Sequence, residues 1–307
     1  MNPVSPKRGL AWAFFGSAMA AAFLVPWKAA TAHGEPELAV LVMLATAAMF
    51  NSGLALVQTV RKARSPTGAS WRTTGWVALV FALLTLVGNH ASAHAISLIS
   101  GALLAVVQRC EVLLVAVVGA LLLRESVRPA FWIGSGIAVL GLWVLEQPGT
   151  GGDAFDPLGV LMGLGSAACF GSMVLLARGY SERLHLLPFN AIRLWLSVGL
   201  WFAVERRLPG TSELPAGLLL NAGLAGFFGP FLARLSLLLS ARHLPANVTA
   251  LTALATPIMT LGMSYLTLGN LPTTRELLGG GIMLVGIAVP LLAVAVGQRL
   301  VSRPAGS

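Results

Sequence analysis

Ten apolar runs, separated by short polar segments, follow one another along the 307-residue chain. A helix of roughly 20 predominantly apolar residues spans the hydrocarbon core of a bilayer. We therefore expect an all-α membrane protein with ten transmembrane helices and no soluble domain. The predicted spans lie near residues 9–28, 38–60, 75–97, 102–123, 130–145, 158–177, 188–204, 216–239, 248–268 and 277–296.

Composition supports lipid as the main solvent of this chain. Only 10% of the residues are charged, whereas a soluble domain has about 25%. The formal charge of +9 is spread over short clusters between apolar runs, so it forms neither the patch nor the stripe that nucleic-acid binding needs. Cys110 and Cys169 lie inside apolar runs, where we interpret them as small buried residues and not as a disulfide.

The distribution of Lys and Arg predicts the orientation. If the N-terminus is cytoplasmic, the inner segments hold thirteen basic residues and the outer connections hold only Arg206, Arg207 and Arg275. Cytoplasmic loops of membrane proteins carry this excess of Lys and Arg. We therefore expect a multi-pass protein of the inner membrane with both termini in the cytoplasm. The first apolar run resembles a secretory signal, but we expect it to be retained, because it has a counterpart later in the chain.

The two halves of the chain repeat. An offset of 145 residues pairs identical residues, and these pairs are Leu123 with Leu268, Gly134 with Gly279, Gly136 with Gly281, Ile137 with Ile282, and Gly141 with Gly286. An offset near 150 pairs Gly9 with Gly159. We expect repeats at 9–146 and 157–297. Each has five spans, so the second enters the membrane from the opposite side, as in the inverted repeats of many transporters.

These motifs resemble those of EamA-type carriers in the drug/metabolite transporter superfamily. The first copy of the pattern runs through Leu123-Arg124-Glu125 to the spaced glycines, and the second runs through Pro257 and Leu268-Gly269-Asn270. Two positions depart from the family pattern, because Val112 replaces a proline and Asn270 replaces a glutamate. The resemblance implies two five-helix repeats and a transporter, not an enzyme.

Polar residues in the middle of the spans form the candidate site. Ionisable groups at the centre of a bilayer are costly and normally face a protein interior or an aqueous cavity. Spans three and four are joined by a tight turn, so residues equally far from that turn lie at the same depth. The same argument applies to spans eight and nine. The resulting candidate substrate-binding residues are Asn89, His90, Gln108, Arg109, Glu111, Arg234, Thr252 and Thr256.

Each of these residues also has a simpler interpretation. Glu111 could only neutralise Arg109 or Arg234, and the threonines could only bond their own helix backbone. Arg193 and Lys28 lie nearer to the ends of their spans, so we interpret them as snorkelling to the interface. His90 and His94 have the spacing of metal ligands, but a site needs a third or fourth ligand. We therefore expect no metal and no cofactor.

The sequence favours a secondary transporter that works by alternating access and exports or exchanges a small, carboxylate-bearing metabolite. Arg109 and Arg234 favour an anion, whereas Glu111 favours a proton or a cation. The alternative is a proton-coupled exporter of cationic or lipophilic drugs. A membrane enzyme using Asp153 and Asp156, and a non-transporting subunit, are further alternatives. The expected partners are the substrate, membrane lipid and protons as a coupling ion through Glu111 or His90. A homodimer through the glycine-spaced helices is left open, and no nucleic acid is expected.

Overall fold

The computed structural model describes residues 5–60, 71–99, 107–122, 129–145, 156–180, 183–256, 258–259, 262 and 274–301. Within these residues all regular structure is helical. The first half contains α1 (Pro6–Ala32), α2 (Pro36–Val60), α3 (Trp71–Leu98), α5 (Cys110–Leu122) and α6 (Pro129–Leu145). The second half contains α7 (Pro157–Tyr180), α8 (Leu186–Glu205), α9 (Ala216–Gly226), η3 (Phe227–Ala233), α10 (Arg234–Ser240), α11 (Ala246–Thr252), η4 (Ala253–Ala255) and α13 (Thr274–Val301).

Six stretches of the described residues are long and apolar enough to cross a membrane: Pro6–Trp27, Pro36–Val57, Trp71–Ala95, Pro157–Tyr180, Leu186–Glu205 and Ala216–Ser240. Shorter apolar helices, Cys110–Leu121, Pro129–Val144 and Leu277–Pro290, lie in the fourth, fifth and tenth predicted runs. The ninth run lies partly outside the described residues. Large apolar side chains point outward, and Trp76 and Leu121 are 68% and 74% exposed. Such a surface suits lipid and not water.

The third of the span-length stretches in the second half is one continuous helix with an internal change of winding. α9 leads into η3, a π-helical turn that contains Pro230, and η3 leads into α10. Proline lacks the N–H that an α-helix requires, and single π turns of this kind are frequent at functional sites. The change of winding leaves the Pro230 carbonyl oxygen able to accept a hydrogen bond from Arg193 of α8.

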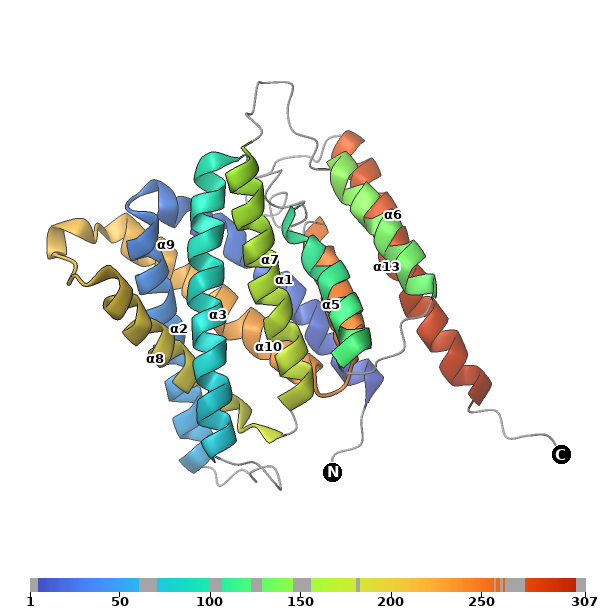
Figure 1. The fold of residues 1–307 in the computed structure, drawn as a ribbon, viewed down its shortest axis with the longest axis horizontal. Helices are drawn as coiled ribbons and strands as arrows, with labels where there is room; N and C mark the ends of the chain where they lie inside the picture. The colour runs from blue at the N-terminus through green and yellow to red at the C-terminus, as the bar shows by residue number, and fades with distance from the viewer. Residues whose placement is uncertain are drawn as a thin grey trace.

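Close backbone contacts relate the two halves. α6 packs along α13 (Figure 1), and a methyl group at Gly134 would lie 2.5 Å from the carbonyl oxygen of Gly286. A methyl group at Gly141 would lie 2.7 Å from the carbonyl oxygen of Gly279. Under the 145-residue offset each of these contacts is converted into the other. Small residues let membrane helices approach this closely.

A second pair of contacts shows the same relation at the two ends of the molecule. Gly9, at the start of α1, packs against Leu244, and Gly159, at the start of α7, packs against Ile99. Correspondingly, α1 packs along α9, η3 and α10, while α7 packs along α3. The start of α1 and the end of α13 point toward the same side of the molecule (Figure 1).

Asparagines join α2 to α8 inside the molecule. Asn190 of α8 donates its side-chain amide to the side-chain oxygen of Asn51 of α2 at 2.5 Å, and both residues are fully buried. One turn further along α8, the exposed Trp195 donates to Ser52 of α2 at 3.0 Å. The same two helices therefore share one buried and one exposed polar link.

We predict that Gly141→Ala lowers the stability of the protein. The added methyl group would meet backbone atoms that cannot move aside, and overpacking of this kind costs about 1–3 kcal/mol. Gly136→Ala is the matched control, because nothing lies within 4 Å of the position that its methyl group would take. Thermal unfolding of the purified variants in detergent is the measurement. Equal melting temperatures for the two variants would show that the α6–α13 contact does not depend on glycine.

We also predict that Asn190→Ala destabilises the protein more than Ser52→Ala. The first change leaves buried polar atoms of Asn51 and Arg193 without a partner, which costs about 1–3 kcal/mol. The second change removes only the hydrogen bond to the exposed Trp195. The two melting temperatures are compared under the same conditions, and a larger loss for Ser52→Ala would contradict the prediction.

Candidate functional site

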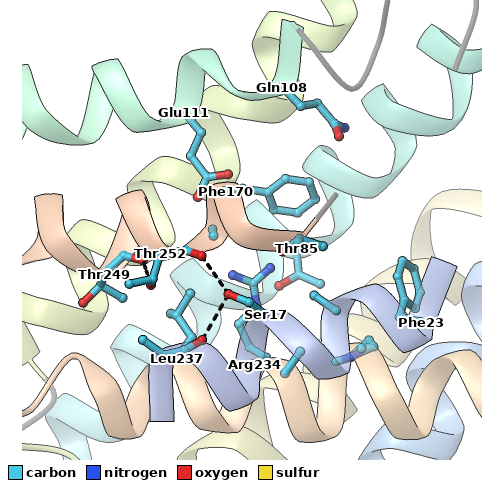
Figure 2. Close-up of a pocket in the computed structure, with 18 of the residues that line it drawn as sticks. Ser17, Phe23, Thr85, Gln108, Glu111, Phe170, Arg234, Leu237, Thr249 and Thr252 are labelled. Atoms are coloured by element: carbon cyan, nitrogen blue, oxygen red, sulfur yellow. Dashed lines mark hydrogen bonds between the residues drawn. The ribbon is translucent and has the colours of Figure 1, made fainter. Parts of the chain in front are cut away.

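A cavity of about 280 Å³ lies inside the helix bundle (Figure 2). Helices from both halves line it, including α1, α3, the start of α5, α7, α8, η3, α10 and α11. Seven of the eight candidate residues from the sequence meet at this cavity. They are Asn89, Gln108, Arg109, Glu111, Arg234, Thr252 and Thr256.

Arg193 is the lining residue that the sequence interpretation placed wrongly. Its side chain does not snorkel, since the residue is only 1% exposed. Nε donates to the Asn190 side-chain oxygen at 2.7 Å, Nη1 to Thr85 Oγ1 at 3.1 Å, and Nη2 to the Pro230 carbonyl oxygen at 3.3 Å. Arg193 lies two turns inside α8, so its depth along the helix was the available signal. Nothing is described of the Lys28 side chain.

Arg234 brings a second guanidinium group to the cavity. Its Cζ lies 5.5 Å from the centre of the Phe170 ring, a favourable position for a cation over an aromatic face. Glu111 approaches the cavity from α5 on the side opposite to Arg234 (Figure 2). The two groups are close enough to attract each other, although no hydrogen bond or ion pair joins them in the described part of the chain.

The beginning of α5 differs from the continuous span expected over 102–123. Arg109 lies in a turn, and α5 begins at Cys110, which places Glu111 in the first turn of the helix. A negative charge is favoured there by the helix dipole. The side-chain amide of Gln108 donates to Ser92 of α3 at 2.9 Å and to Ser166 of α7 at 3.2 Å. These hydrogen bonds fix the start of α5 against two neighbouring helices.

Hydroxyl groups connect the halves on the other side of the cavity. Ser17 of α1 donates its hydroxyl to the carbonyl oxygen of Thr252 at 2.9 Å. The Thr252 hydroxyl itself donates to the Thr249 carbonyl oxygen of the same helix at 2.7 Å. This is the bond to the helix backbone that the sequence analysis gave as the simpler interpretation of the threonines. Asn89 likewise donates to the Thr85 carbonyl oxygen at 2.7 Å. Ser17, Thr85 and Phe170 carried no signal in a single sequence.

His90 lies apart from the cavity. Its Nε2 lies 3.3 Å from the Glu205 carboxylate at the end of α8, and its Nδ1 lies 3.1 Å from the Leu86 carbonyl oxygen. His90 follows Asn89 directly, and successive helix residues point about 100° apart, so the two share a depth but not a face. Beyond Glu205, Arg207 binds both Glu35 and Glu213. In the described residues no three His, Cys, Asp or Glu side chains gather as a metal site.

Asp156 has a local structural role at the start of α7. Its carboxylate accepts the backbone N–H of Leu158 at 2.7 Å and of Gly159 at 3.3 Å, which is the bonding of a helix N-cap. Asp153 lies outside the described residues. The only described member of the Asp-x-x-Asp motif therefore caps a helix.

Comparisons with known proteins agree with this arrangement. The family described as the EamA-like transporter family matches twice, at residues 7–146 and 157–292. A solved crystal structure of a protein has a TM-score of 0.75 and 17% sequence identity, over 94% of this chain and 97% of the other. At that identity the likeness shows the fold alone. No protein of curated function matches the chain. Because the family matches cover most of the sequence, the chain is a multi-pass membrane protein that belongs to the EamA-like transporter family.

Proposed function

We propose that this protein is a secondary transporter that exchanges small carboxylate-bearing metabolites across the inner membrane by alternating access. The observation that carries this proposal is the charge at the cavity. Among the described residues that line it, three carry guanidinium groups, Arg109, Arg193 and Arg234, and one carries a carboxylate, Glu111. A cavity with this excess of positive charge attracts an anion and repels a cation.

The proposed topology is ten spans in two inverted five-helix repeats, with both termini in the cytoplasm. The interchangeable contacts of Gly9 with Leu244 and of Gly159 with Ile99 support the inverted relation. Both ends of the described chain lie on one side (Figure 1), as an even number of spans requires. In such transporters the substrate site lies at the repeat interface, and access alternates as the halves rock against each other.

Glu111 is the residue that favours the alternative function, proton-coupled export of cationic drugs. It is the one acidic side chain among the described residues that line the cavity, so it remains the candidate for proton coupling there. His90 is paired with Glu205 at a distance from the cavity lining, and any role in coupling would act through the outer ends of α3 and α8. The three arginines outnumber Glu111, and we therefore favour the anion.

A homodimer through the glycine-spaced helices stays a proposal, and the packing of the glycines within one chain restricts which of them could take part. Gly134, Gly141 and Gly286 pack between α6 and α13 of the same chain, whereas Gly136 and Gly281 are open. Only the open glycines are available to a second copy.

We predict that Arg234→Gln strongly weakens organic-anion exchange. The purified protein is placed in liposomes, and counterflow of labelled organic acids, amino acids and cationic drugs is measured. Loss of a charge-assisted hydrogen bond to a buried ligand costs about 1.5–3 kcal/mol, so uptake at low substrate concentration should fall about tenfold or more. Arg72→Gln, at an exposed position at the start of α3, is the matched control and should exchange normally.

Two results would contradict the proposal. Exchange of cationic drugs that is lost in Glu111→Gln and kept in Arg234→Gln would establish the alternative function. A wild-type protein that exchanges none of the three classes would remove the transporter mechanism proposed here.

A further inference from the structure

Arg193 is a buried cation whose hydrogen-bond partners are all neutral. They are the Asn190 amide oxygen, the Thr85 hydroxyl and the Pro230 carbonyl oxygen. No carboxylate of the described residues forms an ion pair with it. Burying an unpaired charge is expensive in a protein interior. The fold therefore holds Arg193 rigidly at the cavity while its charge is not neutralised by the protein.

The donor count of Arg193 leaves capacity for a ligand. A guanidinium group has five N–H donors, and the three hydrogen bonds use one donor on each of the three nitrogens. One N–H on each terminal nitrogen is left. Two such donors on neighbouring nitrogens can bond the two oxygens of a carboxylate, and Arg193 belongs to the cavity lining.

Arg234 supplies the second charge. It lies close enough to Arg193 for the two cations to repel each other, and its described contact is with the neutral face of Phe170. Glu111, the one carboxylate among the described lining residues, interacts electrostatically with both Arg109 and Arg234. Among the described lining residues, three guanidinium groups thus face one carboxylate, which is an excess of two positive charges.

The charge that balances this cavity is a pair of negative groups and not a single one. A monocarboxylate would leave one positive charge buried, and a zwitterionic amino acid would leave both. Arg193 and Arg234 come from different helices, α8 and α10, which suits two separate anionic groups better than one compact dianion. Phe23, Met43 and Leu237 give the cavity apolar walls, which suit a hydrocarbon chain between the two groups.

We propose, building on the transport function proposed above, that the substrates are small dicarboxylates. One carboxylate binds Arg193 and the other binds Arg234. Binding of the dianion neutralises the two guanidinium groups and removes their mutual repulsion. Arg193 is thereby the residue that selects diacids over monoacids.

The test compares ligands that share one carbon skeleton. Succinate, its monoamide succinamate and butyrate compete in counterflow against the labelled organic acid that the protein exchanges. Each compound is also tested as a stabiliser of the purified protein in thermal unfolding. Succinate should bind more tightly than succinamate by about tenfold or more, the value of one charge-assisted carboxylate contact. A series from malonate to adipate should show an optimum of chain length, because the two guanidinium groups are fixed by different helices.

Arg193→Gln provides the residue-level test. In this variant succinate should bind no better than succinamate, while the affinity for succinamate should stay within about threefold of the wild type, as expected when one pairwise interaction is removed. Arg72→Gln should keep the full preference for succinate. If Arg193→Gln does not fold, the wild-type ligand series decides the question without it.

The outcomes separate this inference from the function on which it rests. Equal affinity for succinate, succinamate and butyrate would overturn the dicarboxylate assignment and leave anion exchange intact. Tighter binding of a phosphate monoester than of every dicarboxylate would overturn the arrangement of two separated carboxylates. Absence of binding and exchange for every organic anion would overturn both proposals.

Discussion

Close approach of helix backbones is the constraint on which the rest of the structure depends. In lipid, apolar side chains gain little from leaving their surroundings, so helices associate through tight packing and interhelical hydrogen bonds. Gly134, Gly141 and Gly286 provide such packing between α6 and α13. Gly9 and Gly159 provide it at opposite ends of the molecule. At Gly134, Gly141 and Gly286 the backbone of the facing helix lies too near for a Cβ atom. At Gly9 and Gly159 the near atoms belong to the side chains of Leu244 and Ile99 and their neighbours.

Polar groups complete the packing in the interior and form the cavity. The chain of contacts from Asn51 through Asn190 to Arg193 joins α2 and α8, and Arg193 continues it to Thr85 of α3 and to Pro230 of η3. Without water, each of these groups must find a partner inside the protein. The same network that satisfies them also holds a cation at the cavity. Thr85, Arg193 and Pro230 therefore both stabilise the interior and line the cavity.

The sequence predicted the fold better than the details of the site. Span-length helices were confirmed in six of the apolar runs. Hydropathy predicts them well, because a long apolar segment indicates directly that lipid surrounds it. Depth could be counted from the turns, and this placed Asn89, Glu111 and Arg234 together at one cavity. The direction of each side chain around its helix could not be counted in the same way. His90 shows this, since it has the right depth and faces Glu205 instead.

Two further differences have physical causes that lie in tertiary contacts. Arg193 was interpreted as an interface residue, because a single sequence does not reveal that Asn190, Thr85 and Pro230 meet around it. The turn at Arg109 was not predicted, because the segment from Val107 to Val112 contains neither a glycine nor a proline. Local propensity favours a regular helix there. In the structure the chain instead turns at Arg109, next to Gln108, whose side chain forms hydrogen bonds to α3 and α7.

The paired contacts of Gly9 with Leu244 and of Gly159 with Ile99 have a consequence for how a second shape is encoded. One contact tightens one end of the molecule, and its counterpart tightens the other. Under the alternating access proposed above, the two halves would exchange their small differences in tilt. The contact at one end would then loosen while its counterpart at the other end tightens. The second conformation would need no new set of surfaces at these two ends, because each contact already has its equivalent in the other half.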